Sequence, residues 1–330
     1  MSFDNINNVN QQKSNLFKLI LLTVLAYIVL IVSVFIPFIG IIGLALISIP
    51  SIKLMLEGRK WESILCALIG SFVLFFIDWT MPVFFFVFVI CTALVYLYCF
   101  KRGKSPFFII TLNSILFIAL IILYILAVSF ARQENLIISF LNNYKTVINN
   151  FPADPLVKQY MQIMAISETQ FKTLYEQSKN IFLMLPYLIP GLLLIYIFFS
   201  SLINYYWCAS IFKKSSLILR SMPLFKTWDL PWYYVAGIIT GLILIVIPYF
   251  NVSYNFILNA VGINLLIVFG AFYSVLGFSV AWGIFDKFNV ALIWRVLIIL
   301  LISFFLILIV VIPIMGILDV WINFRKLERH

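Results

Sequence analysis

The chain has 330 residues, of which 64% are hydrophobic and 10% are charged, and its mean hydropathy is +1.13. A soluble domain carries roughly 25% charged residues, so this composition excludes a water-soluble globular protein. The formal net charge of +10 would indicate nucleic acid as the partner of a soluble protein. Here the basic residues form short clusters beside apolar segments, so we expect them to face the anionic headgroups of a lipid bilayer, with no role in nucleic-acid binding.

Long apolar runs decide the fold class. Runs of about 18 or more apolar residues recur along the chain, and each is long enough to cross a bilayer as a helix. A membrane β-barrel would instead show alternating segments of about 10 residues, which this sequence does not contain. The sequence therefore predicts an all-α, polytopic integral membrane bundle of about nine transmembrane helices, within a range of about 8–10, and an extramembrane helical hairpin.

The first 131 residues are predicted to form a tail and a membrane core. Residues 1–15 are rich in asparagine and indicate a disordered cytoplasmic tail, and residues 16–131 indicate a five-helix core. Pro37 and Gly40 predict a tight turn after the first helix, and Pro50 interrupts the second. Basic clusters follow the second, fourth and sixth predicted helices, which is the positive-inside pattern: Lys53, Arg59 and Lys60; Lys101, Arg102 and Lys104; Lys213, Lys214 and Arg220.

Residues 132–180 are the one long polar interval among the apolar segments, and they predict an extracytoplasmic helical hairpin. Asp154 before Pro155 predicts the start of one helix, and Ser167 with Gln170 predicts a capping box for a helix that runs into the next span. The first helix of this interval has an apolar face formed by Ile137, Leu141, Tyr144 and Ile148. We expect Tyr160, Ile163 and Met164 of the next helix to cover this face, and the membrane surface is the alternative cover.

The sequence after this interval predicts a sixth core helix, a loop and a C-terminal bundle. Residues 181–212 form the sixth core helix, kinked by Pro186 and by Pro190 with Gly191, and residues 213–233 form a basic cytoplasmic interfacial loop. Residues 234–330 hold the C-terminal membrane helices and tail, with a last helix expected over residues 291–315. Three tryptophans are predicted to anchor the chain in the headgroup layer: Trp228, Trp232 and Trp321.

Small residues predict close contacts between helices of the C-terminal part. Gly237 and Gly241 have GxxxG spacing, and a seam of small residues follows one face of the 256–285 segment, formed by Gly270, Ser274 and Gly277. That segment is long for one span. One crossing gives about nine spans with 14 of the 22 Lys and Arg residues inside, and two crossings give about ten spans with 15 inside. The positive-inside rule barely separates these two topologies, and we choose nine.

Catalytic and metal-binding motifs are absent from the sequence. It has no phosphate-binding loop, no HExxH and no GxSxG, and its one histidine is the terminal His330. Cys66, Cys91, Cys99 and Cys208 fall inside apolar segments without a CxxC pair, which indicates helix packing. We therefore expect no enzymatic activity and no cofactor or metal.

The candidate functional residues are polar side chains inside the apolar segments. Asp78, Asp286 and Arg295 lie near helix ends, where a charge can reach the membrane surface. Four asparagines lie nearer the middle of their segments: Asn113, Asn204, Asn259 and Asn264. Two interpretations remain for them, namely hydrogen bonding between helices and binding of a ligand.

Two short motifs carry a resemblance to a known family. The stretch Pro223-Leu-Phe-Lys-Thr-Trp-Asp-Leu-Pro231 and the stretch from Gly316 to Arg325 resemble the YybS-type family of bacterial membrane proteins of unknown function. The first six helices resemble, more distantly, the substrate-binding S component of energy-coupling-factor transporters, through the Pro37–Gly40 turn and the Gly58-Arg-Lys loop. The polar interval at 132–180 departs from a compact S component.

The sequence favours a multi-pass protein of the plasma membrane that binds or transports a small molecule. The resemblance to S components makes transporter ATPase or coupling subunits the candidate partners. The alternative is a non-transporting scaffold or assembly protein that recruits a partner through the 132–180 hairpin.

Overall fold

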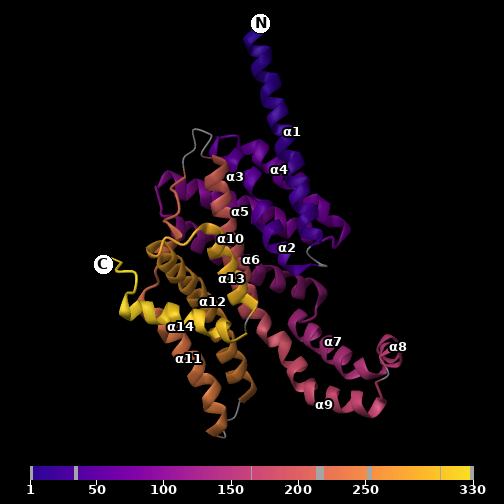
Figure 1. Ribbon diagram of the computed structural model, residues 1–330. Coiled ribbons are helices and arrows are strands. Elements are labelled where there is room, and N and C mark those ends of the chain that lie inside the picture. Colours follow the sequence, from indigo (N-terminus) through magenta and orange to yellow (C-terminus); the bar gives the residue numbers. More distant parts are fainter. Residues whose placement is uncertain are drawn as a thin grey trace. The chain divides into compact units, whose positions relative to one another are not determined.

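The computed structural model describes residues 3–32, 36–164, 166–212, 219–250, 255–304 and 306–327, and every regular element in these ranges is a helix (Figure 1). The chain forms two compact units. Unit 1 comprises Met1–Arg132 and Tyr196–Met222, and unit 2 comprises Gln133–Ile195 and Pro223–His330. Five helices are long and apolar enough to cross a membrane: Ile39–Leu56, Met81–Lys101, Pro106–Arg132, Glu168–Phe212 and Phe256–Lys287. The predicted all-α class is thus confirmed for the described residues, and the number of spans stays a prediction.

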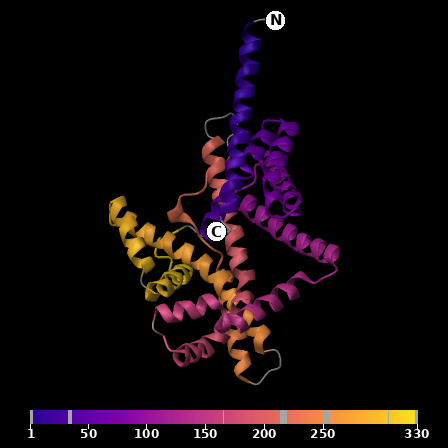
Figure 2. The ribbon, with the colours of Figure 1, turned by 90° about the vertical axis from the view of Figure 1, so that its right-hand side faces the viewer.

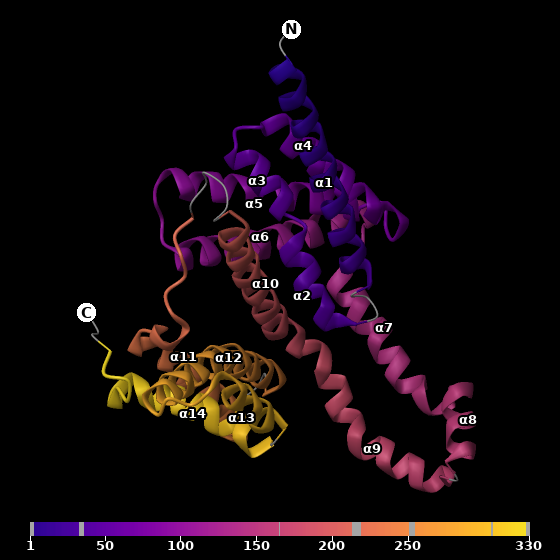
Figure 3. The same cartoon turned by 45° about the horizontal axis from the view of Figure 1, so that its top comes forward.

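Unit 1 surrounds an interrupted helix. Its helices are α1 (Phe3–Val32), α2 (Pro37–Leu46), α3 (Ile49–Leu56), α4 (Lys60–Phe72), η1 (Val73–Phe76), α5 (Met81–Lys101), α6 (Pro106–Arg132) and the C-terminal part of α10 (Ile189–Phe212). Helix α3 packs against α1, α4 and α5, and α2 packs against α1 (Figure 3). The α2–α3 segment is the most buried of the five candidate spans.

The break between α2 and α3 lies beside Pro50, as the sequence predicts. Pro50 occupies the first turn of α3, where its missing N–H costs no helical hydrogen bond. Because Pro50 cannot donate to the carbonyl four residues earlier, the helix cannot continue unchanged through this point. Residues 47 and 48 form a turn instead.

Residues 136–184 form three helices, α7 (Leu136–Asn150), α8 (Pro155–Ile163) and α9 (Glu168–Met184), with η2 (Phe151–Ala153) before α8. The predicted caps are confirmed: Asp154 accepts from the Leu156 amide, and Ser167 and Gln170 form a capping box. Helix α9 continues through η3 (Leu185–Leu188) into α10, as expected from the sequence. Helix α8 lies between the far ends of α7 and α9 (Figures 1 and 3).

The predicted cover for α7 is wrong. Helix α9 packs against α7, and the hydroxyls of Tyr175 and Tyr144 donate to the carbonyls of Ile148 and Phe182 at 2.5 and 2.9 Å. The expected cover from α8 is exposed instead, with Tyr160, Ile163 and Met164 at 57%, 71% and 53%. The nine residues of α8 span about 14 Å, too short to follow α7, whereas α9 returns along it.

The C-terminal helices pack on one long helix. Helix α12 (Asn255–Lys287) contacts α11 (Val235–Val246) and α14 (Leu306–Ile322), and α13 (Leu292–Phe304) contacts α14. Helices α11 and α12 run side by side (Figures 1 and 2). Short 3₁₀ turns precede and follow α11: η4 (Phe225–Thr227), η5 (Trp232–Tyr234) and η6 (Ile247–Phe250).

Three predictions about helix limits differ from the structure. Helix α1 begins at Phe3, so residues 3–15 are helical; no Gly or Pro lies between Met1 and Ile36 to stop the helix. Its first turns extend beyond the rest of unit 1 (Figure 2). Pro37 begins α2, so the 37–40 segment is the first turn of a helix rather than a tight turn.

Helix α12 is uninterrupted, which agrees with one crossing of this segment and not with the alternative of two. The last helix also differs from its expected range of 291–315: the structure describes α13 (Leu292–Phe304) and α14 (Leu306–Ile322), and α14 extends to Ile322 and packs against α12. The predicted positions of Lys213, Lys214 and His330 lie outside the described residues.

Candidate functional site

Two helix breaks inside apolar segments are each joined to another helix by an asparagine. In unit 1, Asn204 on α10 donates from Nδ2 to the Ala45 carbonyl at 2.5 Å and to Ser48 Oγ at 3.0 Å. Its Oδ1 accepts from the Tyr96 hydroxyl at 2.7 Å. Asn204 is 2% exposed. The amide thus satisfies a backbone oxygen at the turn between α2 and α3 that apolar surroundings would leave without water.

Asn113 extends this polar cluster of unit 1. On α6, its Oδ1 accepts from Thr92 at 3.0 Å and its Nδ2 donates to Ser201 at 3.1 Å. Ser200, next to Ser201 on α10, donates to the Ile41 carbonyl of α2 at 3.2 Å. The cluster therefore connects α2, α5, α6 and α10 through buried polar groups that are paired with one another.

Asn264 bridges the second break, which is the 3₁₀ turn η3 (Leu185–Leu188) between α9 and α10, in unit 2. Its Oδ1 accepts from the Gly191 amide at 2.6 Å, and its Nδ2 donates to the Tyr187 carbonyl at 2.6 Å. Residues 187 and 191 are an i, i+4 pair, so the asparagine amide takes the place of the helical hydrogen bond that they would make with each other. Gly191 is required here, because a Cβ would lie 2.6 Å from Asn264 Oδ1.

The remaining polar candidates of the sequence lie apart from these breaks. Asn259 is half-buried and has no side-chain hydrogen bond to the described part of the chain. Asp78 lies between η1 and α5, where its carboxylate accepts from the amide and hydroxyl of Thr80 at 2.8 and 2.6 Å and faces Arg132 at 3.5 Å. These hydrogen bonds from Thr80, with Arg132 in support, hold the pKa of Asp78 below its usual value.

The predicted packing glycines of α11 face α12. A Cβ on Gly241 would lie 3.1 Å from the Gly262 carbonyl oxygen, and one on Gly237 would overlap the Phe269 ring. On α12, Gly277 lies against the backbone of Ile312 in α14. Gly270 has no neighbour within 4 Å of where its Cβ would be, and Ser274 donates within its own helix to the Gly270 carbonyl.

Of the three predicted interfacial tryptophans, two are exposed and the third packs within a loop. Trp232 and Trp321 are 70% and 59% exposed. Trp228 donates to the Pro223 carbonyl at 3.1 Å, and its ring meets Phe225 edge to face. The folded loop that contains it is where the main ionic cluster of unit 2 forms.

Arg325 is the centre of that ionic cluster. Its side chain is 4% exposed, and it pairs with the fully buried Asp319 of α14 at 2.8 Å. Nη1 donates to the carbonyls of Lys226 and Trp228, each at 2.8 Å, and to Ser279 of α12 at 2.7 Å. One guanidinium therefore connects the C-terminal segment, the 225–228 loop and α12 by hydrogen bonds. A guanidinium is suited to this role because it carries five N–H donors in a fixed planar arrangement.

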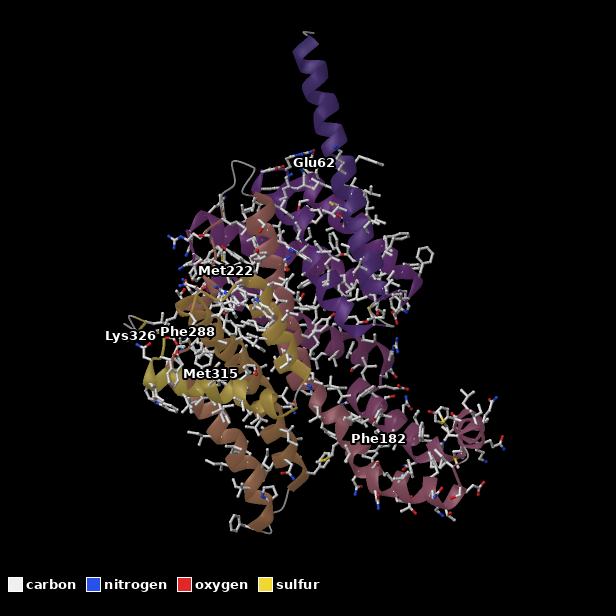
Figure 4. All side chains as sticks on the ribbon, in the orientation of Figure 1. Glu62, Phe182, Met222, Phe288, Met315 and Lys326 are labelled. Atoms are coloured by element: carbon white, nitrogen blue, oxygen red, sulfur yellow. The ribbon has the colours of Figure 1, made fainter. Side chains whose placement is uncertain are left out.

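A second ion-pair group adjoins the first. Asp286 near the end of α12 pairs with Lys226 of the loop at 2.8 Å and with Arg295 of α13. Arg295 also lies over the Trp282 ring, 5.3 Å from its centroid. Figure 4 shows Phe288, just after α12, and Lys326, next to Arg325, on the same side of unit 2.

The family comparison covers most of the chain. A family model described as "Predicted membrane protein (DUF2232)" matches residues 24–320, nearly the whole chain. The chain belongs to this family. It is therefore a predicted membrane protein of unknown function, and its several long apolar helices agree with a location in a membrane. No curated protein and no solved structure matches the chain.

Within this member of the family, sequence reasoning missed Asp319 and Arg325 as a buried pair. The tail was expected to leave the membrane after residue 315, whereas α14 extends to Ile322 and buries Asp319 completely. A signal was present: the two stretches on which the YybS-type resemblance was based, 223–231 and 316–325, are the two segments that Arg325 joins. Asp319 and Arg325 are six residues apart in a stretch whose only other polar residue is Asn323.

Proposed function

We propose that the protein is a binding or transport-type component of the membrane that takes a small molecule. The observation that supports this proposal is the break in the α2–α3 segment, the most buried candidate span, with the Ala45 carbonyl held by Asn204. Interrupted helices whose backbone groups face a polar site are typical of substrate sites in transporters. In the proposed role, a polar ligand binds at this break by hydrogen bonds to the Asn204 amide.

The proposed partners of the protein rest on the resemblance stated above. The YybS-type likeness and the distant likeness to S components of energy-coupling-factor transporters support a role beside transporter ATPase or coupling subunits. We place the protein in the bacterial plasma membrane with about nine spans, the 132–180 interval outside the cell and anionic lipid at the basic loops. The absence of catalytic motifs in the sequence supports a protein without enzymatic activity or cofactor.

Mass spectrometry of small molecules retained by the purified protein tests the proposal. The wild type should release a defined small molecule on denaturation, and Asn204→Leu should lose it because the leucine removes both amide groups at the break. Asn259→Leu is the matched control and should retain it. The proposal fails if the wild type releases no small molecule, or if Asn204→Leu retains as much as the control.

A scaffold function is the second candidate, and the exposed apolar residues of α8 favour it. Leu156 and Ile163 are 75% and 71% exposed on a helix whose neighbour α9 is polar. In this case a protein partner binds the 132–180 interval. Purification from membranes of the full chain and of a Leu156→Ser/Ile163→Ser variant distinguishes the two functions. A partner lost only from the variant supports the scaffold, and co-purified ATPase subunits in both samples support the transport component.

A further inference from the structure

Two loops of unit 1 bring basic side chains together. Helix α5 ends in a Schellman motif, in which the Gly103 amide donates to the Phe100 carbonyl at 3.1 Å and the Lys104 amide donates to the Cys99 carbonyl at 3.0 Å. Gly103 has φ +59°, the left-handed conformation that this motif needs at its turn residue. The turn reverses the chain into α6 and leaves Lys101, Arg102 and Lys104 at the end of the helix pair.

Arg220 joins this turn from the distant segment after α10. Its Nη2 lies 3.9 Å from the position that a Cβ on Gly103 would take. Its backbone is held in place because the Tyr205 hydroxyl of α10 donates to the Arg220 carbonyl at 2.6 Å. Lys101, Arg102 and Arg220 are exposed and Lys104 is half-buried. We call these four residues the basic patch.

The basic patch has no carboxylate partner in the described part of the chain. Unit 1 has three carboxylates whose side chains are described, and each pairs elsewhere: Glu57 with Lys53 and Arg59, Glu62 with Arg59, and Asp78 with Arg132. The 57–59 loop can be compared directly with the turn at Gly103, because Gly58 ends α3 with the same Schellman hydrogen bonds. That loop neutralises its arginine internally, whereas the basic patch leaves its charges for an external anion.

The position of the patch identifies the kind of anion. Only residues 102–105 separate the candidate spans Met81–Lys101 and Pro106–Arg132, so this loop cannot leave the membrane surface. The chain that carries Arg220 follows the candidate span ending at Phe212. Arg102 and Lys104 also lie over the rings of Tyr98 and Phe108, at 4.6 and 5.1 Å, an amphipathic arrangement suited to the headgroup layer.

We propose that the basic patch is a binding site for the phosphate headgroup of an anionic phospholipid. The guanidinium groups of Arg102 and Arg220 bind the phosphate oxygens by charge-assisted hydrogen bonds, and Lys101 and Lys104 add positive charge around them. The lipid would then hold the α5–α6 turn and the segment after α10 together. This site is independent of the proposed ligand site at Asn204.

Lipid binding is measured on the full chain purified in a neutral detergent. Phosphatidylglycerol and phosphatidylcholine are titrated separately, with bound lipid counted by native mass spectrometry and the melting temperature followed by tryptophan fluorescence. For the wild type we expect bound phosphatidylglycerol and a higher melting temperature, with little effect of phosphatidylcholine. Arg102→Gln/Lys104→Gln/Arg220→Gln should weaken phosphatidylglycerol binding about tenfold or more, since each basic residue contributes about 1 kcal/mol near an anionic surface.

The matched control removes the same charge elsewhere. Lys145→Gln/Lys158→Gln/Lys172→Gln, on α7, α8 and α9, should bind phosphatidylglycerol as the wild type does. Circular dichroism of both variants checks their helix content, and Arg220→Gln alone serves if the triple variant does not fold. Equal binding by the patch variant and the control overturns the proposal. Displacement of the lipid by millimolar inorganic phosphate also overturns it, because the patch would then be a site for a small anion.

Discussion

At the scale of single residues, an asparagine can replace a helical hydrogen bond from outside the helix. Asn264 pairs with both the Gly191 amide and the Tyr187 carbonyl, and Asn204 pairs with the Ala45 carbonyl at the α2–α3 turn. Both breaks lie beside prolines that the sequence already marks, Pro50 and Pro190. An amide is suited to this task because it is at once a donor and an acceptor.

Replacing Asn264 should therefore be costly. Asn264→Leu leaves the Gly191 amide and the Tyr187 carbonyl without partners in apolar surroundings, and we expect a loss of about 1–3 kcal/mol in unfolding free energy. Thermal unfolding in detergent measures this loss. Asn259→Leu, in the same helix but without such bonds, should change the melting temperature little. Equal melting temperatures for the two variants would show that the bridge contributes nothing.

At the scale of elements, the contact between α12 and α14 depends on glycine. Gly277 lies against the Ile312 backbone, and Gly316 lies against the Tyr273 carbonyl. No side chain fits at these two positions, so the helices approach at backbone distance. Of the seam predicted on α12, Gly277 lies in this contact, whereas Gly270 has nothing within 4 Å of its Cβ position and Ser274 donates within its own helix. The sequence could not name α14 as the neighbour, because an apolar helix does not encode which other helix packs against it.

Gly277→Leu should force α14 away from α12. Overpacking costs typically about 1–3 kcal/mol, and a backbone neighbour cannot move aside as a side chain can, so we expect a lower melting temperature in detergent. Gly270→Leu is the control on the same helix, since nothing lies within 4 Å of its Cβ position. If both variants melt like the wild type, the close contact is not needed for stability.

The Arg325 cluster also acts between elements. Arg325→Met removes the partner of the fully buried Asp319, and loss of one member of a buried ion pair costs about 3–5 kcal/mol. Arg325→Met/Asp319→Leu removes the buried charge as well and should recover part of that loss. Chemical or thermal unfolding of both variants measures the difference. If the double variant is less stable than Arg325→Met alone, then the buried charge of Asp319 is not the cause of the lost stability.

At the scale of the whole molecule, the orientation in the membrane can be tested in cells. The 132–180 interval is predicted to lie outside because α6 should end opposite the Lys101–Lys104 loop. Single cysteines at Asn143 or Gln159, both exposed, in a chain without its four native cysteines, should react with an impermeant thiol reagent added to whole cells. A cysteine at Lys101 is the control and should react only after the cells are opened. The reverse pattern would invert the predicted topology.

The sequence by itself determined the class of protein and the helix caps of the 136–184 segment. Long apolar runs require helices in a membrane, because every backbone group must find a partner within its own segment. The caps at Asp154 and Ser167 depend on neighbours within three residues, so local sequence was enough to predict them. The positions of the four asparagines, the glycine pair and the stretches 223–231 and 316–325 were also visible in the chain.

Only the tertiary structure decided which of these features meet. Asn204 reaches a carbonyl 159 residues away and Arg325 reaches a carbonyl 97 residues away, and no local pattern encodes such pairings. Apolar surroundings make the pairings necessary, since a buried polar group without a partner is costly. The choice of partner depends on which helices pack, and that is why α9 rather than α8 covers α7, and why Asp319 is buried rather than in a tail.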